Sequence, residues 1–300
     1  MSARIDPGTA VGRVALTVRD GARVAEFYER VLGLERLTTE PGRTTLGAGG
    51  TPLVELYEDP AAPLRPPRTT GLFHLALLVA DRAELAASLR RIVAHRWPLS
   101  GASDHLVSEA LYLSDPEGNG IEVYRDRPRE QWRRDGDEVA MATLPLDVDA
   151  LFAEGPERAP ERTAATTTMG HVHLEVADLQ ATERFYSGLL GLDVTARGYP
   201  GALFLAAGGY HHHVGTNTWR GARGPASAGS AGLRWYELTL PSAAARDAAA
   251  GALTAGGVET AAAEGAGAVP QATDTDGGAG AAGAVVARDP GGVELRLALS

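Results

Sequence analysis

Cysteine is absent from the 300-residue sequence, and its absence removes several classes of function. Without thiols the chain has no disulfide scaffold, no thiolate metal site and no cysteine nucleophile. Histidine, aspartate and glutamate remain as the strong metal ligands, and this donor set suits iron, manganese, zinc or nickel. Any metal chemistry of this protein must therefore be built from imidazoles and carboxylates.

Long apolar runs and an excess of positive charge are also missing. No uninterrupted apolar segment approaches the roughly 18 residues that cross a bilayer, and the N-terminus lacks the apolar run of a signal peptide. The formal net charge is −10, whereas binding of nucleic acid needs a basic face. We therefore expect a cytoplasmic protein that binds neither membranes nor nucleic acid, with a homo-oligomer as the commonest form of assembly.

A repeated pattern organises what is present. Arg13–Asp20 resembles His171–Asp178, and each has the alternation of an apolar strand that ends in aspartate. Each is followed by a helix-like run that should stop at a glycine, Gly33 in the first case and Gly191 in the second. The pattern predicts the same strand–helix arrangement in both halves of the chain.

Two fainter copies bring the number of units to four. His74–Asp81 opens the second unit and Leu233–Pro241 opens the fourth. We interpret each unit as a strand, a helix and about three further strands, which makes an α+β fold of four βαβββ units. The units run over residues 10–58, 70–126, 168–219 and 231–299. The predicted domains are 1–126 (units one and two), a linker at 127–168, and 169–300 (units three and four).

Three sequence features resemble one superfamily. The helix of units one and three carries the pattern Phe-Tyr-x3-Leu-Gly-Leu. Gly101–Glu122 places a histidine, a tyrosine and a glutamate at set intervals, and Pro200–His213 ends in three consecutive histidines. Together they resemble the vicinal oxygen chelate superfamily, which includes glyoxalase, bleomycin-resistance and extradiol dioxygenase proteins. The last two features are similar to its two-domain catechol-2,3-dioxygenase branch.

The resemblance implies that two units pair into a curved half-barrel, with metal ligands on the first strand of each unit and on a last strand. The first-strand position lies seven residues before the aspartate of each unit. In chain order that position holds Arg13, His74, His171 and either Arg234 or Trp235. Only units two and three offer a histidine there, and arginine cannot ligate a metal. The last-strand carboxylate of unit two is Glu122.

His74, His171 and Glu122 would then form the triad of two histidines and one carboxylate that leaves one face of Fe(II) open to substrate and oxygen, with Mn(II) as a possible substitute. Such a site requires unit two to pair with unit three and leaves units one and four as a scaffold. Sequential pairing, one with two and three with four, is the alternative. It would need a histidine of residues 211–213 together with Glu294.

The resemblance also implies three catalytic residues. Tyr112 would hold the substrate oxygen that keeps or loses its proton, and His105 would hydrogen-bond the reaction intermediate. His212 aligns with the acid–base histidine of the family, and an unperturbed pKa near ~6.5 suits that role. The resemblance places His212 on the last strand of its unit, and strand alternation then puts His211 and His213 on the opposite face.

Each candidate also has a purely structural interpretation. His74 and Tyr112 could be core residues of apolar strands, and the consecutive histidines an adventitious metal-binding patch. Glu122 could be a solvated carboxylate, although a glutamate in mid-strand is costly if it is buried without a partner. His173 alternates onto the same face as His171, so either could be the ligand, and the spacing to the aspartate favours His171.

The function that the resemblance implies is that of an extradiol dioxygenase of aromatic hydrocarbon catabolism. It would open the ring of a small aromatic diol next to its hydroxyl groups, with O2 as co-substrate. Two other classes stay open. A glyoxalase-like isomerase or lyase usually places two carboxylates on its metal, and only Glu122 is evident here. A binding protein that sequesters an antibiotic would have no need of the metal.

Overall fold

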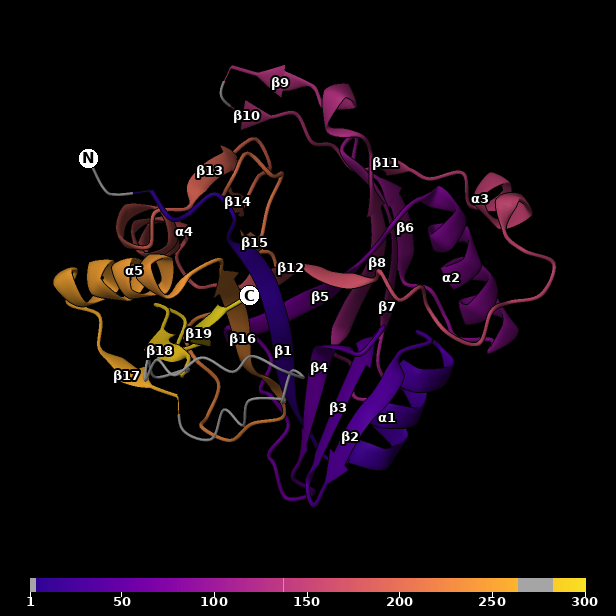
Figure 1. The fold of residues 1–300 in the computed structure, drawn as a ribbon, viewed down its shortest axis with the longest axis horizontal. Coiled ribbons are helices and arrows are strands. Elements are labelled where there is room, and N and C mark those ends of the chain that lie inside the picture. The colour runs from indigo at the N-terminus through magenta and orange to yellow at the C-terminus, as the bar shows by residue number, and fades with distance from the viewer. Residues whose placement is uncertain (1–3, 137, 264–282) are drawn as a thin grey trace, which may run out of the picture.

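Two curved β-sheets form the framework of the protein, and helices lie on their outer faces (Figure 1). The computed structural model describes residues 4–136, 138–263 and 283–300. Within these residues each of the four units contributes a leading strand, a helix and further strands, so the predicted α+β fold is confirmed. None of the described helices has both the length and the apolar character needed to cross a membrane.

The elements follow the units. Unit one comprises β1 (Ala10–Val18), α1 (Gly21–Arg30), β2 (Glu35–Glu40), β3 (Arg43–Ala48) and β4 (Thr51–Glu58). Unit two comprises β5 (Gly71–Val79), α2 (Arg82–Ala94), β6 (Gly101–Asp104), β7 (Ser108–Ser114) and β8 (Gly120–Asp126). The connecting segment contains η1 (Arg129–Gln131), β9 (Arg134–Asp135), β10 (Glu138–Val139), β11 (Leu144–Pro145) and α3 (Val148–Glu154).

The second half repeats the order. Unit three comprises β12 (Thr168–Glu175), α4 (Leu179–Glu183), η2 (Arg184–Leu189), β13 (Asp193–Ala196), β14 (Ala202–Ala206) and β15 (Val214–Asn217). Unit four comprises β16 (Gly232–Leu240), α5 (Ala243–Ala255), β17 (Thr260–Ala262), β18 (Val285–Arg288) and β19 (Glu294–Leu299).

The aspartate that follows the leading strand caps the next helix. Asp20, Asp81 and Asp178 each accept a hydrogen bond from a backbone N–H two or three residues ahead, which satisfies a donor that has no partner within the helix. The first and third units then turn at Gly33 and Gly191, whose φ angles of 74° and 89° lie in the left-handed region. The repeated spacing in the sequence therefore reflects a repeated strand-to-helix turn.

The strand order joins units that are far apart in the sequence. One sheet has nine strands in the order β11-β6-β7-β8-β5-β12-β15-β14-β13, so units two and three meet at β5 and β12. The other has eight strands in the order β17-β18-β19-β16-β1-β4-β3-β2, which joins units one and four. The alternative, in which unit one pairs with unit two and unit three with unit four, is not the pairing in these sheets. The division of the chain at residues 126 and 168 stays a prediction.

A salt-bridge cluster occupies the middle of the eight-stranded sheet. Ala15 on β1 pairs with Glu55 on one side and with Trp235 on the other, and Arg13 lies two residues earlier on the same face. The Arg13 guanidinium contacts Glu55 at 2.5 Å and Glu237 at 2.6 Å. Both carboxylates are buried. A fixed cation thus neutralises two acids at the position where the nine-stranded sheet carries His74.

Replacing Arg13 with methionine is expected to lower the free energy of unfolding by about 3–5 kcal/mol, because it leaves the buried Glu237 carboxylate without its counterion. Glu55 keeps Arg43 at 2.8 Å. Urea denaturation of the metal-free protein measures the change. Arg30→Met is the control, since Arg30 pairs with Glu26 on an exposed face of α1, where such pairs contribute about 0–1 kcal/mol. Equal, small effects of both substitutions would contradict a structural role for the Arg13 cluster.

Candidate metal centre

Three neighbouring strands place the predicted ligands close together in the nine-stranded sheet. Ala76 on β5 pairs with Glu122 on β8 and with His171 on β12. Paired residues of adjacent strands point to the same face, and His74 shares that face because it precedes Ala76 by two residues. The small side chain of Ala76 leaves space between its larger neighbours. The register alone therefore brings an acid and two histidines together.

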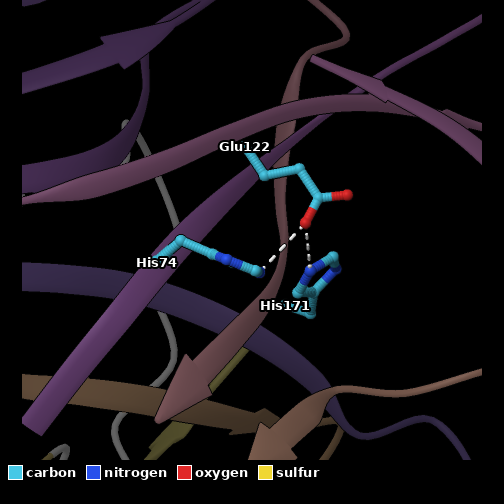
Figure 2. A group of neighbouring side chains, drawn as sticks. All are labelled: His74, Glu122 and His171. Atoms are coloured by element: carbon cyan, nitrogen blue, oxygen red, sulfur yellow. Dashed lines mark hydrogen bonds and ion pairs between the residues drawn. The ribbon is translucent and has the colours of Figure 1, made fainter. Parts of the chain in front are cut away.

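The side chains of His74 and His171 both point toward one carboxylate oxygen of Glu122 (Figure 2). Nε2 of His74 and Nε2 of His171 each lie 3.0 Å from Oε2 of Glu122. The ligand atoms all fall within 4.8 Å of one another, and all three residues are buried. Ligand bonds of about 2.1 Å that meet at right angles would separate two donors by about 3.0 Å. The distance from each histidine to Glu122 therefore matches that of two adjacent positions around one metal ion.

The donor atoms also fit a metal chemically. Nε2 of His74 is buried and forms no hydrogen bond, although it lies near the Glu122 oxygen. Buried polar atoms normally have a hydrogen-bond partner, so this nitrogen lone pair is suited to a cation. The residues present fit an ion of the kind that two imidazoles and a carboxylate bind.

Burial and neighbouring charge set the protonation states that ligation requires. Burial lowers the pKa of His171 from 6.5 to about 4, so the imidazole is neutral near pH 7. Burial alone would raise the pKa of Glu122, but the adjacent His171 and His74 hold it well below its usual value. Metal ligands must be deprotonated, and both residues meet that condition.

His173 occupies a different place from His171. It pairs with His74 across β5 and β12, and the two ring centroids are 4.9 Å apart. Its other neighbours are Phe73 at 5.2 Å and Trp219 at 5.5 Å. Among the described residues the ligand group consists of His74, Glu122 and His171. This arrangement favours His171 as the ligand and places His173 beside the site.

Tyr112 and His105 form a hydrogen-bonded pair next to Glu122. Tyr112 pairs with Glu122 across β7 and β8. Nδ1 of His105 lies 2.7 Å from the carbonyl oxygen of Ala142 and must donate to it, so Nε2 accepts from the Tyr112 hydroxyl, also at 2.7 Å. Burial, reinforced by the Glu122 carboxylate, raises the pKa of Tyr112 well above 10. Tyr112 is therefore a protonated hydrogen-bond donor at neutral pH.

The predicted alternation of the three consecutive histidines is wrong. The segment precedes β15 and is not part of a strand, so His211 and His212 do not point to opposite faces. Their Nδ1 atoms lie 2.7 Å apart. His213 differs again, because its Nδ1 accepts the backbone N–H of Ala207 at 3.2 Å. Loop geometry, which strand periodicity does not describe, brings two of the three rings into contact.

A hydrogen-bonded relay runs from Asp126 through His211 to His212, beside the proposed ligand His171. Nε2 of His211 lies 2.9 Å from Oδ1 of Asp126 and donates to it, so Nδ1 of His211 accepts from Nδ1–H of His212. Burial lowers the pKa of His212 well below 6.5, so the unperturbed value expected from the sequence is wrong. The proton-free nitrogen of the neutral His212 ring is then Nε2. The His212 ring lies 4.1 Å from that of His171 and lines the same cavity as Glu122. Asp126 thereby selects the tautomer of His212.

Asp126 was missed in the sequence, although a signal for it was present. It ends β8 four residues after Glu122, and an even spacing puts both side chains on one face of a strand. Tyr210 was missed too; its hydroxyl donates to Oδ2 of Asp126 at 2.8 Å. Neither contact could be inferred from periodicity, because both span two units.

A cavity of about 330 Å³ connects these groups. It is lined by Phe73, His74, Ser100, Gly101, Ser103, His105, Val107, Ser108, Tyr112, Glu122, Met141, Thr143, His173, Tyr199, Phe204, His212 and Trp219. Its size falls in the range of roughly 300–1,000 Å³ that is usual for small-molecule sites. All three predicted catalytic residues therefore face one small-molecule cavity together with two of the predicted ligands.

Paired βαβββ units with a buried His–His–Glu group beside a cavity define a class of proteins that bind a metal and a small molecule. Residues 10–123 and 168–297 match the family model of the Glyoxalase/Bleomycin resistance protein/Dioxygenase superfamily, and the chain belongs to that superfamily.

Known proteins refine this placement. The chain is 42% identical over 243 residues to "Catechol-2,3-dioxygenase" of Bacillus subtilis (strain 168), which covers 79% of this chain and 85% of that protein. This relative supports a dioxygenase-like enzyme. A crystal structure of a candidate dioxygenase from Bacillus subtilis subsp. subtilis str. 168 superposes with a TM-score of 0.66 at 12% identity, covering 99% of this chain and 86% of that one. The crystal structure of glyoxalase I from Zea mays superposes with a TM-score of 0.54 at 16% sequence identity, covering 97% of this chain and 92% of that one. At these identities the two structures show the fold alone.

Proposed function

We propose that this protein is an extradiol dioxygenase that opens a catechol-type ring next to its hydroxyl groups, with O2 as co-substrate and Fe(II) as its metal. The observation that carries the proposal is the convergence of His74, Glu122 and His171 beside the Tyr112–His105 pair and His212. The relative named Catechol-2,3-dioxygenase supports the same reaction type. His74, Glu122 and His171 are the proposed metal ligands.

When bound, the ferrous ion would supply open coordination positions for a chelating diol and for O2. The protein residues manage the protons. His212 presents Nε2 as the acceptor for a substrate hydroxyl proton, because its Nδ1–H is engaged by His211. The positive charge that His212 gains is offset by Asp126 at the far end of the relay. Such general-base assistance typically contributes about 10²–10⁴-fold to rate.

Tyr112 and His105 act on the other side of the cavity. The Tyr112 hydroxyl stays protonated and can turn from His105 to donate to a substrate oxygen. His105 is anchored by its Nδ1–H bond to Ala142, so its Nε2 keeps its direction when that happens. Donors fixed in this way stabilise developing negative charge best where water is excluded. Phe73, Phe204 and Met141 give the cavity apolar walls.

The proposal is tested by oxygen uptake with catechol and protein that was loaded anaerobically with Fe(II). We expect stoichiometric O2 consumption and a yellow ring-opened product, followed by absorbance. Protein loaded with Mn(II) in parallel distinguishes the two metals. A panel of catechols that gives neither uptake nor product with either metal, while the protein holds the metal, would contradict the proposal. Metal content is measured in the same samples.

The alternative classes have less support. A glyoxalase-like isomerase usually needs two carboxylates on its metal, and the ligand group among the described residues contains one. An antibiotic-binding protein would have no need of the buried histidine relay. A second carboxylate ligand, detected spectroscopically after metal loading, would favour the isomerase.

A further inference from the structure

An aromatic wall adjoins the ligand group in the cavity. His74, Glu122 and the Tyr112–His105 pair form the polar part of the lining. Phe73, Phe204 and Trp219 form the aromatic wall: the Phe73 ring lies 5.3 Å from that of His74, and the Phe204 ring lies 5.0 Å from that of His212. The Phe73 and Trp219 rings lie 5.5 Å apart, and the buried His173 packs between them and Phe204. A substrate that places its hydroxyl groups on the polar part of the lining would contact this aromatic wall with the rest of its ring.

Trp219 is exposed although it belongs to the cavity. Its exposed fraction is 48%, which places it among the few large apolar side chains that the described residues leave open to solvent. The side chain is held in place, because its Nε1–H donates to the carbonyl oxygen of Pro200 at 2.8 Å. An exposed, fixed aromatic ring at a cavity is the feature that an apolar ligand group would cover.

Positive charge is missing from the lining. Glu122 is the acidic side chain among the residues that line the cavity. The sequence contains no lysine, and no arginine of the described residues lines this cavity. Arg220 stacks on Phe73 at 4.8 Å but pairs with Glu175 and lies outside the lining.

These features together select among substituents on the ring. A carboxylate on the ring substituent would lose its hydration against this wall and find no cationic side chain in the lining, which is costly. An alkyl or aryl substituent would instead leave water and contact aromatic surface, which is favourable. The cavity of about 330 Å³ also exceeds what a single unsubstituted ring would fill.

We propose that this site takes an uncharged catechol that carries an alkyl or aryl substituent, and that it selects against carboxylated catechols. The substituent lies against Phe73, Phe204 and Trp219. This inference rests on the proposed dioxygenase function of the site. It assigns these three residues as specificity determinants.

The test compares kcat/KM for phenylcatechol, methylcatechol, unsubstituted catechol and dihydroxybenzoate in the Fe(II)-loaded protein. We expect phenylcatechol to exceed catechol by about tenfold or more, since apolar contacts of this size discriminate by roughly 10–200-fold. Dihydroxybenzoate should fall about 100-fold below phenylcatechol. Isothermal titration under anaerobic conditions should give the same order of affinities without turnover. If no catechol is cleaved, the proposed function fails; if dihydroxybenzoate equals or exceeds phenylcatechol, only the present inference fails.

Two pairs of variants separate the contributions of shape and charge. Trp219→Ala should reduce the ratio of phenylcatechol to catechol activity by about tenfold, whereas Leu64→Ala, which removes an exposed apolar side chain outside this cavity, should leave the ratio unchanged. Met141→Arg introduces a guanidinium into the lining and should raise relative activity on dihydroxybenzoate at least tenfold, and Met141→Gln should not. An unchanged ratio in Trp219→Ala together with no gain in Met141→Arg would overturn the inference.

Discussion

Replacing Glu122 with glutamine is expected to abolish ferrous ion binding. The carboxylate supplies the negative charge of the ligand group, and both histidine Nε2 atoms lie 3.0 Å from its Oε2. Losing a residue that merely supports a ligand typically lowers metal affinity by about 10–100-fold, so removal of a direct ligand should exceed about 100-fold. Anaerobic titration with Fe(II) measures the affinity. We expect ring cleavage to be lost in parallel.

The two histidines of β12 provide a matched pair for the same experiment. His171→Ala should lose the metal, whereas His173→Ala should retain it, because His173 lies outside the ligand group. Thermal unfolding separates ligand loss from misfolding: metal at about 100 times its Kd stabilises a binding-competent protein by about 2.7 kcal/mol. His171→Ala should unfold cooperatively and show no such gain. Metal loss in His173→Ala with retention in His171→Ala would reverse the ligand assignment.

The positions of His74, His171 and Glu122, the proposed ligands, could be predicted because each depends on local spacing. The distance from His74 or His171 to its aspartate equals the length of one strand that ends in a helix cap, and both capped turns are present. Glu122 could be placed because it follows a tight turn and stands in mid-strand. These features are local to one unit, so a single sequence is enough to find them.

Contacts between units could not be predicted in the same way. The segment that contains His211 approaches the end of β8 only after units two and three have joined. Its backbone is a loop, so the period of two that governs strands did not apply to His212 and its neighbours. The sequence predicted that Tyr112 and His105 would both lie near the substrate. The structure adds the bond of His105 to Ala142, which determines its direction.

Replacing His212 with asparagine is expected to lower kcat by about 10²–10⁴-fold, the usual contribution of a positioned general base. Affinity for Fe(II) should stay within a fewfold of the parent, because His212 is not in the ligand group. Steady-state kinetics on catechol together with metal titration measure the two effects. His213→Asn is the matched control: His213 does not line the cavity, and its Nδ1 accepts a backbone N–H from Ala207, so kcat should change little.

The relay from Asp126 through His211 also determines which nitrogen of His212 carries the proton. Asp126 can only accept a hydrogen bond, which keeps the proton of His211 on Nε2 and that of His212 on Nδ1. In Asp126→Asn the amide can also donate, so both tautomers become accessible and His212 Nε2 is no longer reserved as an acceptor. We expect kcat to fall about 10–100-fold. The ¹⁵N chemical shifts of the histidines in metal-free protein should show the altered tautomer. A kcat loss without that spectral change would mean that Asp126 acts only through packing.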